Sequence, residues 1–273
     1  MNTNEHPSSI LIVVDPAQET PLALHRAINS AKLAPPLVET VKLNILLAVD
    51  FDNTDTSASN SAIHRNERWY EEQIMTPLQN SGVEYSVEMS WSSDWYGSII
   101  GASKRHKPDL IMLPLVSRLK PRERIFNESI WRLLRTAESP VLVVQPGSPE
   151  ERKVILAAVN IQSHKPDYQR LNDLIVARGR RTALNNHGEL HIVNAYKDSL
   201  NYPDRALLAT KTEVEPSRIY VTAGDPDDVI AETANELNAD LIVLGVRSRT
   251  SRWRGNTSEK IITKVNCDVL MIN

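Results

Sequence analysis

Apolar runs of strand length alternate along this chain with stretches that have helical periodicity. The runs of the first half lie at 9–14, 42–49, 84–89, 110–115 and 141–145. Those of the second half lie at 154–159, 189–195, 218–222, 241–244 and 269–272. Alternation of this kind is typical of βαβ units. It predicts an α/β fold with mainly parallel sheets and helices on both sheet faces.

The two series of runs align as copies of one another. Equivalent positions are Asp15 and Asn160, Leu43 and Leu190, Asp109 and Asp240, and Val141 and Val269. A short polar stretch rich in turn residues, 146–152, separates the series and is typical of a linker. The sequence therefore predicts two domains, 1–146 and 153–273, and the alternative is one domain with a single ten-stranded sheet. Residues 197–216 replace the longer 51–83, so the second copy is expected to have a shortened helical region there.

Composition narrows the range of functions. The chain is 41% hydrophobic and 24% charged with a net charge of -3, which is ordinary for a folded protein and does not favour nucleic-acid binding. Cys267 is the only cysteine, so neither an intrachain disulfide nor a Cys-x-x-Cys site can form. No apolar run approaches a membrane span, and the first residues lack the pattern of a signal peptide. We therefore expect a cytoplasmic protein without a membrane partner.

Four segments of the second copy form a distinctive series. They are Gly-Asp-Pro-Asp-Asp-Val-Ile at 224–230, Ala-Asp-Leu-Ile-Val-Leu-Gly at 239–245, Gly-Asn-Thr-Ser-Glu-Lys at 255–260 and Cys-Asp-Val-Leu-Met-Ile at 267–272. This series resembles the universal stress protein family, and 107–112 and 139–144 resemble it more loosely. The resemblance implies a five-stranded α/β domain in each copy, two domains packed as a pseudo-dimer, and a role in the cytoplasmic stress response. It also implies ATP as a candidate ligand, because many members bind it.

The second copy departs from the family's ATP-binding pattern, G-x2-G-x9-G-[ST] with an aspartate at the end of the first strand. Ser248 stands at the second glycine, and only six residues separate it from Gly255. Asn256 takes the place of the hydroxyl residue, and the first-strand aspartate is Asn160. The candidate cofactor-binding residues of this copy are Asn160, Gly224, Gly245, Ser248, Gly255, Asn256 and Thr257. Four arginines, at 247, 249, 252 and 254, make the same loop basic, which fits either an anion site or a solvated loop.

The first copy retains Asp15 at the end of its first strand, and Asp15 is its candidate cofactor-binding residue. Its loop 114–126 has no glycine, and without glycine the backbone cannot approach phosphates closely. The scattered histidines suggest no metal site, and no nucleophile has an adjacent base. The sequence predicts a non-catalytic stress protein with degenerate nucleotide loops that binds a protein partner it does not name. The alternative is an ATP-binding, weakly hydrolysing switch in the second domain, and association into a homodimer is left open.

Overall fold

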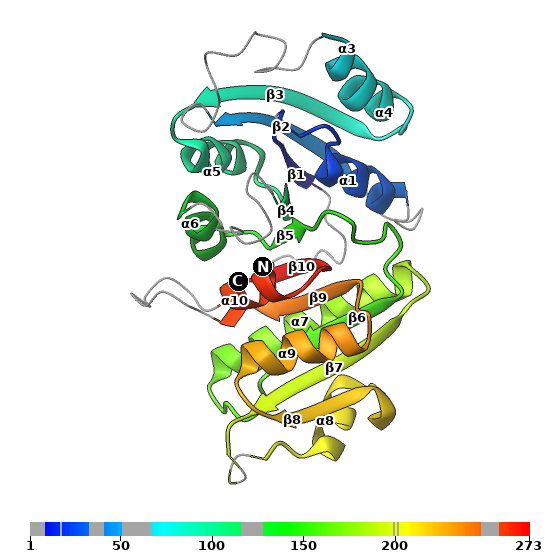
Figure 1. Cartoon of the computed structure of the whole chain (residues 1–273), viewed down its shortest axis with the longest axis vertical. Coiled ribbons are helices and arrows are strands. Elements are labelled where there is room, and N and C mark those ends of the chain that lie inside the picture. The colour runs from blue at the N-terminus through cyan, green and yellow to red at the C-terminus, as the bar shows by residue number, and fades with distance from the viewer. Residues whose placement is uncertain are drawn as a thin grey trace. The chain divides into compact units, whose positions relative to one another are not determined.

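A computed structural model of the chain divides into two compact units, Met1–Pro146 and Gly147–Asn273 (Figure 1). It describes residues 9–16, 18–32, 41–50, 67–115, 128–198, 200, 202–246 and 257–273. The side chains of Asp50, 128–131 and 257–259 are not described. Each unit is presented by itself below.

The first unit alternates strands and helices. Its elements are β1 (Ser9–Val14), α1 (Leu22–Lys32), β2 (Lys42–Asp50), α3 (Glu67–Tyr70), a π-helical turn η1 (Glu71–Met75), α4 (Thr76–Gln79), β3 (Glu84–Ser92), α5 (Trp95–His106), β4 (Leu110–Pro114), α6 (Glu128–Thr136) and β5 (Val141–Val144). Its strand order is β3-β2-β1-β4-β5, with every pair parallel.

The second unit repeats this succession. Its elements are β6 (Val154–Ala158), α7 (Pro166–Asn185), β7 (Glu189–Tyr196), α8 (Arg205–Thr212), a 3₁₀ turn η3 (Pro216–Arg218), β8 (Ile219–Ala223), α9 (Pro226–Glu236), β9 (Leu241–Gly245), α10 (Thr257–Lys264) and β10 (Asp268–Ile272). Its strand order, β8-β7-β6-β9-β10, is the order of the first unit element for element, and its pairs are parallel. The predicted α/β class is confirmed, and equal strand orders are what a duplication predicts.

Right-handed crossovers place the helices on both faces of each sheet. In the second unit α7 and α8 cover one face, and α9 and α10, which contact one another, cover the other (Figure 1). The central strands are apolar, apart from Ser9 at the start of β1, because both of their faces are buried. Among the helices that the structure describes, none has both the length and the apolar character that crossing a bilayer requires.

The sequence predicted a shortened helical region in the second copy between β7 and β8. Of the described residues there, 205–212 form the single helix α8, where the first unit has α3, η1 and α4. Asp204 begins α8, and its carboxylate accepts hydrogen bonds from the backbone N–H groups of Ala206 (2.8 Å) and Leu207 (3.2 Å). This cap compensates two of the helix's unpaired donors and fixes where the short helix starts.

A buried ion pair fixes the start of the second unit. Arg152 Nη2 lies 2.7 Å from Asp268 Oδ2 at the start of β10, and both side chains are buried. Ser148 Oγ donates to the other oxygen of Asp268, Oδ1, at 2.5 Å. Residues 148 and 152 belong to the stretch that the sequence predicted to be a linker. In the structure, this stretch is bonded into the sheet of the second unit.

We expect Asp268→Ala to lower the free energy of unfolding of the second unit by about 3–5 kcal/mol, because it leaves the Arg152 guanidinium buried and unpaired. Urea unfolding followed by circular dichroism measures the change. The matched control is Glu151→Ala, which removes the exposed pair with Lys153 (3.1 Å) and should cost far less. Equal losses in the two variants would contradict a structural role for the buried pair.

His191 is a buried titratable group in β7. Its Nδ1 lies 3.4 Å from the Tyr220 hydroxyl, and its Nε2 lies 3.6 Å from Glu189 Oε2. Burial lowers the pKa of His191; the charge of Glu189 acts in the opposite direction, and that of Arg218 adds to the lowering. The folded unit therefore favours the neutral imidazole.

A lowered histidine pKa predicts a loss of stability in acid. Above the unfolded-state pKa, about 6.5, the imidazole is neutral whether the chain is folded or not, and its contribution is fully present. As the pH falls below that value, the unfolded chain takes up the proton first, so the second unit should become easier to unfold.

The urea midpoint measured between pH 7.5 and 5 should therefore fall less steeply in His191→Gln than in the wild type. His164→Gln removes an exposed histidine of the same unit and should keep the wild-type slope. If His191→Gln kept that slope as well, His191 would not be the group responsible.

Candidate functional site

The carboxyl ends of β6 and β9 form the point where strand order reverses in the second unit. Ligands of doubly wound sheets bind in the crevice at such a point. Asn160 follows β6, Gly245 ends β9, and the two strands are paired neighbours, so the structure brings these two predicted residues to one edge. Gly224 follows β8, which β7 separates from β6. Thr257 begins α10, whereas Ser248, Gly255, Asn256 and the four arginines lie outside the described residues.

The backbone of Asn160 is bonded to α7. Its N–H donates to Asn172 Oδ1 (3.0 Å), and its carbonyl accepts from Asn172 Nδ2 (2.9 Å). The side chain of Asn172 thus pairs with both polar backbone groups of Asn160, while Asn160 itself is exposed. This reciprocal pair holds the chain where it leaves β6.

A second amide network lies next to this loop, around the fully buried Asn194 of β7. Asn194 Oδ1 accepts from the backbone N–H of Ile161 (3.0 Å), and its Nδ2 donates to Gln162 Oε1 (2.9 Å). The carbonyl of Ala195 accepts from both Asn194 Nδ2 and Gln162 Nε2, each at 2.9 Å. This backbone acceptor at the end of β7 therefore already has two protein donors. Sequence analysis missed the network, although an asparagine within an apolar strand was a signal for it.

Gly245 provides space for a neighbouring helix. A Cβ at this position would lie 2.5 Å from Leu171 Cδ2 and 3.2 Å from Ile175 Cδ1, both on α7. The room that the missing side chain leaves at the end of β9 is therefore filled by the packing of α7. The first unit has Pro114 at the equivalent strand end.

Gly224 provides a turn. Its φ of +149° is one that residues with a Cβ rarely adopt, and a Cβ there would lie 2.9 Å from Val229 Cγ2. Its N–H donates to the carbonyl of Tyr196 at 2.9 Å. Gly224 thus connects the end of β8 to α9 through backbone conformation and close packing.

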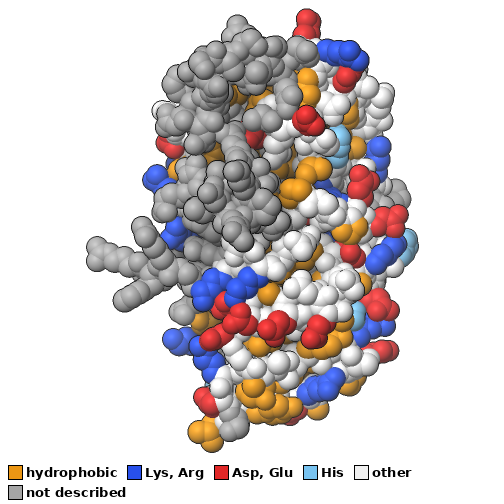
Figure 2. Space-filling view, in the orientation of Figure 1, with side chains coloured by type: hydrophobic (Ala, Val, Ile, Leu, Met, Phe, Trp, Pro, Cys, Tyr) orange, Lys and Arg blue, Asp and Glu red, His pale blue; other side chains and the backbone are white. Residues whose placement is uncertain are grey.

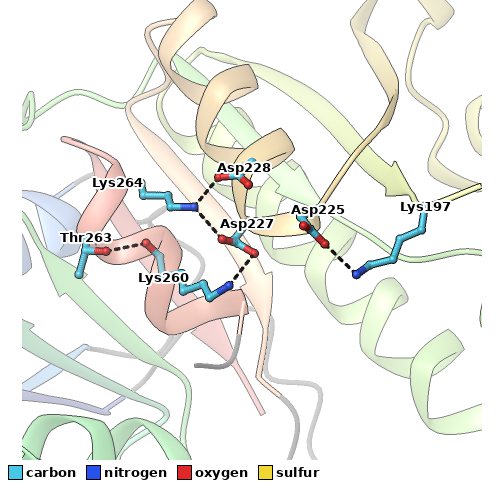
Figure 3. Close-up of polar contacts among 7 residues, drawn as sticks. All are labelled: Lys197, Asp225, Asp227, Asp228, Lys260, Thr263 and Lys264. Atoms are coloured by element: carbon cyan, nitrogen blue, oxygen red, sulfur yellow. Dashed lines mark hydrogen bonds and ion pairs between the residues drawn. The ribbon is translucent and has the colours of Figure 1, made fainter. Parts of the chain in front are cut away.

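A cluster of ion pairs, which we call the α9–α10 brace, connects the first turn of α9 to α10 (Figure 3). Lys264 Nζ contacts Asp227 Oδ2 at 2.7 Å and Asp228 Oδ1 at 2.5 Å. Lys260 Nζ lies 3.4 Å from Asp227 Oδ1. Beside the brace, Lys197 Nζ lies 2.7 Å from Asp225 Oδ1.

The brace favours the charged form of its members. Burial alone would raise the pKa of Asp227, but the hydrogen bond and charge of Lys264, helped by Lys260, outweigh it and lower that pKa. The hydrogen bonds to Asp227 and Asp228 in turn raise the pKa of Lys264. Carboxylates in the first turn also complement the positive end of the α9 dipole. The lysines near this helix terminus are thus matched by the protein's own carboxylates.

In the first unit, Asp15 directly follows β1 and is buried. Its carbonyl accepts a hydrogen bond from the N–H of Gln18 at 3.0 Å, which forms the turn that leads toward α1. Asp15 and Pro114 end neighbouring strands, β1 and β4, so the equivalent crevice of this unit has a proline where the second unit has Gly245.

Two further groups bear on the chemistry. The thiol of Cys267 is buried, and burial, together with the charge of Asp268, raises its pKa to about 12. The thiol is therefore protonated at neutral pH and a poor nucleophile. Within the described part of the chain, no group of three or more His, Cys, Asp or Glu side chains is placed to bind a metal ion.

Gly245→Ala tests whether this glycine serves packing. We expect a loss of about 1–3 kcal/mol in the free energy of unfolding, since the new methyl group overlaps Leu171. In a double-mutant cycle the same change should cost less when Leu171 is already alanine. Urea unfolding of the four proteins measures this. An identical cost in both backgrounds would show that Leu171 does not fill the space beside Gly245.

Known proteins resemble this chain in sequence and in fold. Residues 156–273 match the model of the universal stress protein family. Universal stress protein E of Escherichia coli (strain K12) is 28% identical over 298 residues, which cover 97% of this chain and 93% of that protein. The universal stress protein E homolog of Haemophilus influenzae is 27% identical over 299 residues, covering 97% and 96%.

Solved structures share the fold over the length of the chain. A crystal structure of a universal stress protein from Archaeoglobus fulgidus has a TM-score of 0.69 at 16% identity, covering 96% of this chain and 95% of that one. A crystal structure from Pseudomonas aeruginosa UCBPP-PA14, which also bears the name universal stress protein, has a TM-score of 0.80 at 23% identity. The match covers 99% of this chain and 95% of that one. The predicted resemblance is therefore confirmed: the chain is similar to universal stress protein E along nearly its whole length, and residues 156–273 match the model of the universal stress protein family.

Proposed function

We propose that this protein serves the cytoplasmic stress response by binding a protein partner, without catalysis, and that its two units pack as a pseudo-dimer. Similarity to the universal stress proteins supports the stress-response role. The identical strand orders of the two units support the pseudo-dimer, because a pseudo-dimer is built from two copies of one domain.

The position of Leu171 carries the argument against a nucleotide. A phosphate cradle needs room for the ligand beside a glycine, and at Gly245 that room is occupied by a leucine side chain from α7. Backbone polar groups at the ends of the neighbouring strands already have hydrogen-bond partners within the protein. The N–H of Asn160 donates to Asn172, and the carbonyl of Ala195 accepts from two donors. A triphosphate that used the space beside Gly245 would have to displace the side chain of Leu171.

The charges of the site support the same proposal. Lys197, Lys260 and Lys264 each form an ion pair with an aspartate at the N-terminus of α9. A ligand phosphate would have to compete with these carboxylates for the lysines. For catalysis, the protonated, buried thiol of Cys267 is a poor nucleophile.

Isothermal calorimetry with ATP, with and without Mg²⁺, tests the proposal. The full chain is expected to show no binding tighter than a Kd of about 1 mM. Micromolar binding would contradict the proposal and favour the ATP-binding switch in the second unit. That interpretation would be supported if the binding were lost in Gly255→Val and kept in Gly101→Val, since the only heavy atom within 4 Å of where a Cβ would stand at Gly101 is Arg105 Nη1, at 3.4 Å. The lost heat would then report on the nucleotide loop.

A further inference from the structure

The two units differ at one buried polar position of their sheets. Asn44 of β2 and His191 of β7 directly follow the aligned residues Leu43 and Leu190, and both side chains are buried. The strand registers agree with this equivalence, because each of the two lies one position further along its pairing with the first strand of its unit. The duplicated fold therefore has an amide at this position in one unit and a titratable group in the other.

In the first unit this position is uncharged. Asn44 Nδ2 donates to Ser9 Oγ (3.0 Å), and Asn44 Oδ1 accepts from Ser86 Oγ of the border strand β3 (2.9 Å). Amide and hydroxyl groups do not titrate near neutral pH. The side-chain contact between β2 and its border strand is therefore independent of pH.

In the second unit His191 connects β7 to the border strand β8. Its imidazole stacks on Tyr220 of β8, with ring centroids 6.0 Å apart and an angle of 25°, and its Nδ1 lies 3.4 Å from the Tyr220 hydroxyl. Glu189 Oε2 lies 3.6 Å from His191 Nε2, and Glu189 Oε1 lies 3.1 Å from Arg218 Nη2. One carboxylate of β7 thus lies between His191 and an arginine of η3, the turn that leads into β8.

Helix α9 packs on the face of β7 that carries His191. Side chains alternate along a strand, and Leu190 lies against Gly179 of α7, so His191 faces the opposite side. The carboxylates in the first turn of α9 belong to the brace, and its other two, Glu232 and Glu236, are exposed. The charged side chains of α9 are therefore either paired or in solvent.

The strands on either side of β7 add no further charge. β6 and β8 have no ionisable side chain besides Tyr220. Among the described groups, Glu189 and Arg218 are therefore the charges that act on the imidazole. Burial lowers the pKa of His191, Glu189 opposes this effect, and Arg218 adds to the lowering.

The border strand β8 is only partly held by burial. It pairs with β7 alone among the described strands, and of its five residues Ile219 is buried whereas Thr222 and Ala223 are exposed. It lies at the lower border of the second unit in Figure 1, and the space-filling view shows apolar side chains at the surface of that end (Figure 2). Separating such an element costs less free energy than unfolding the whole unit.

We propose that His191 is a pH-sensitive switch for this border: its protonation releases β8 and η3 from β7 while the rest of the second unit stays folded. In the closed form the imidazolium is buried close to the Arg218 guanidinium. Opening removes Tyr220 and Arg218 from the imidazole and leaves Glu189 to pair with it.

The direction of the pH dependence follows from this exchange of partners. Above the ordinary histidine pKa, about 6.5, the imidazole is neutral in both forms and β8 stays paired. Below that value the open form takes up the proton first, so acid favours opening. Since one proton is taken up, the ratio of open to closed form rises by at most about tenfold per pH unit. The release uncovers the backbone edge of β7.

Hydrogen–deuterium exchange of the full chain at about pH 7.5, 6.5 and 5.5, followed by mass spectrometry, tests the proposal. Each rate is divided by that of the unfolded peptide at the same pH, so that the pH dependence of the chemical step cancels. The protection of 219–223 should be lower than that of 154–158 in β6 at each pH, and should fall by up to about tenfold per pH unit in acid. A low concentration of urea should accelerate exchange of 154–158 but not of 219–223, because local opening exposes little surface.

Three variants identify the group. His191→Asn places the residue of the first unit in the second and should remove the pH dependence of 219–223. Arg218→Gln removes the cation that opposes the imidazolium in the closed form, so the pH dependence should weaken. The matched control is His187→Asn, which removes an exposed histidine of the same unit at a left-handed position (φ +49°) that asparagine tolerates, and should keep the wild-type response.

Three results would overturn the proposal. The first is a wild-type protection of 219–223 that does not change with pH. The second is equal protection and equal urea dependence of 219–223 and 154–158, which would show that the unit opens only as a whole. The third is a pH response that persists unchanged in both His191→Asn and Arg218→Gln.

Discussion

Helix α7 lies close against the sheet of the second unit because a glycine stands at each end of the contact. Toward the carboxyl ends of the strands, Gly245 of β9 accommodates Leu171; toward the other end, Gly179 of the helix accommodates Leu190, whose Cδ1 would lie 2.8 Å from an added Cβ. At both glycines the space of the missing side chain is filled by a leucine of the packing partner. These two contacts therefore determine how closely α7 lies on the sheet of the second unit.

The same constraint explains why the sequence could predict the fold better than the site. Apolar runs marked the strands, since burial on both faces requires them, and even β1 has the bounds that its run predicted. At its carboxyl end β3 was predicted too short, because Ser90, Trp91 and Ser92 continue the strand by pairing with β2, without the apolar character of a buried run. Such pairing depends on a neighbour far away in the sequence.

For Gly245, the sequence left two uses open that both require a missing side chain: phosphate approach and helix packing. Only the position of Leu171, which is distant in the sequence, distinguishes them. Two aspartates at equivalent helix starts show in the same way that the sequence alone does not identify a residue's partner. Asp94 caps α5 by accepting from the N–H of Gly97 (2.8 Å), whereas Asp225, also at a helix start, pairs with Lys197. The brace likewise joins residues whose separation along the chain hides them from any local pattern.

The anchoring of Arg152 by Asp268 has a consequence for biosynthesis. Arg152 leaves the ribosome 116 residues before its partner. Protein synthesis proceeds at about 5–20 residues per second, so roughly 6–23 seconds pass between the translation of Arg152 and that of Asp268. During this interval the second unit lacks the strand whose carboxylate pairs with Arg152 in the folded structure. Its sheet can therefore close only late, after the first unit has already been released from the exit tunnel.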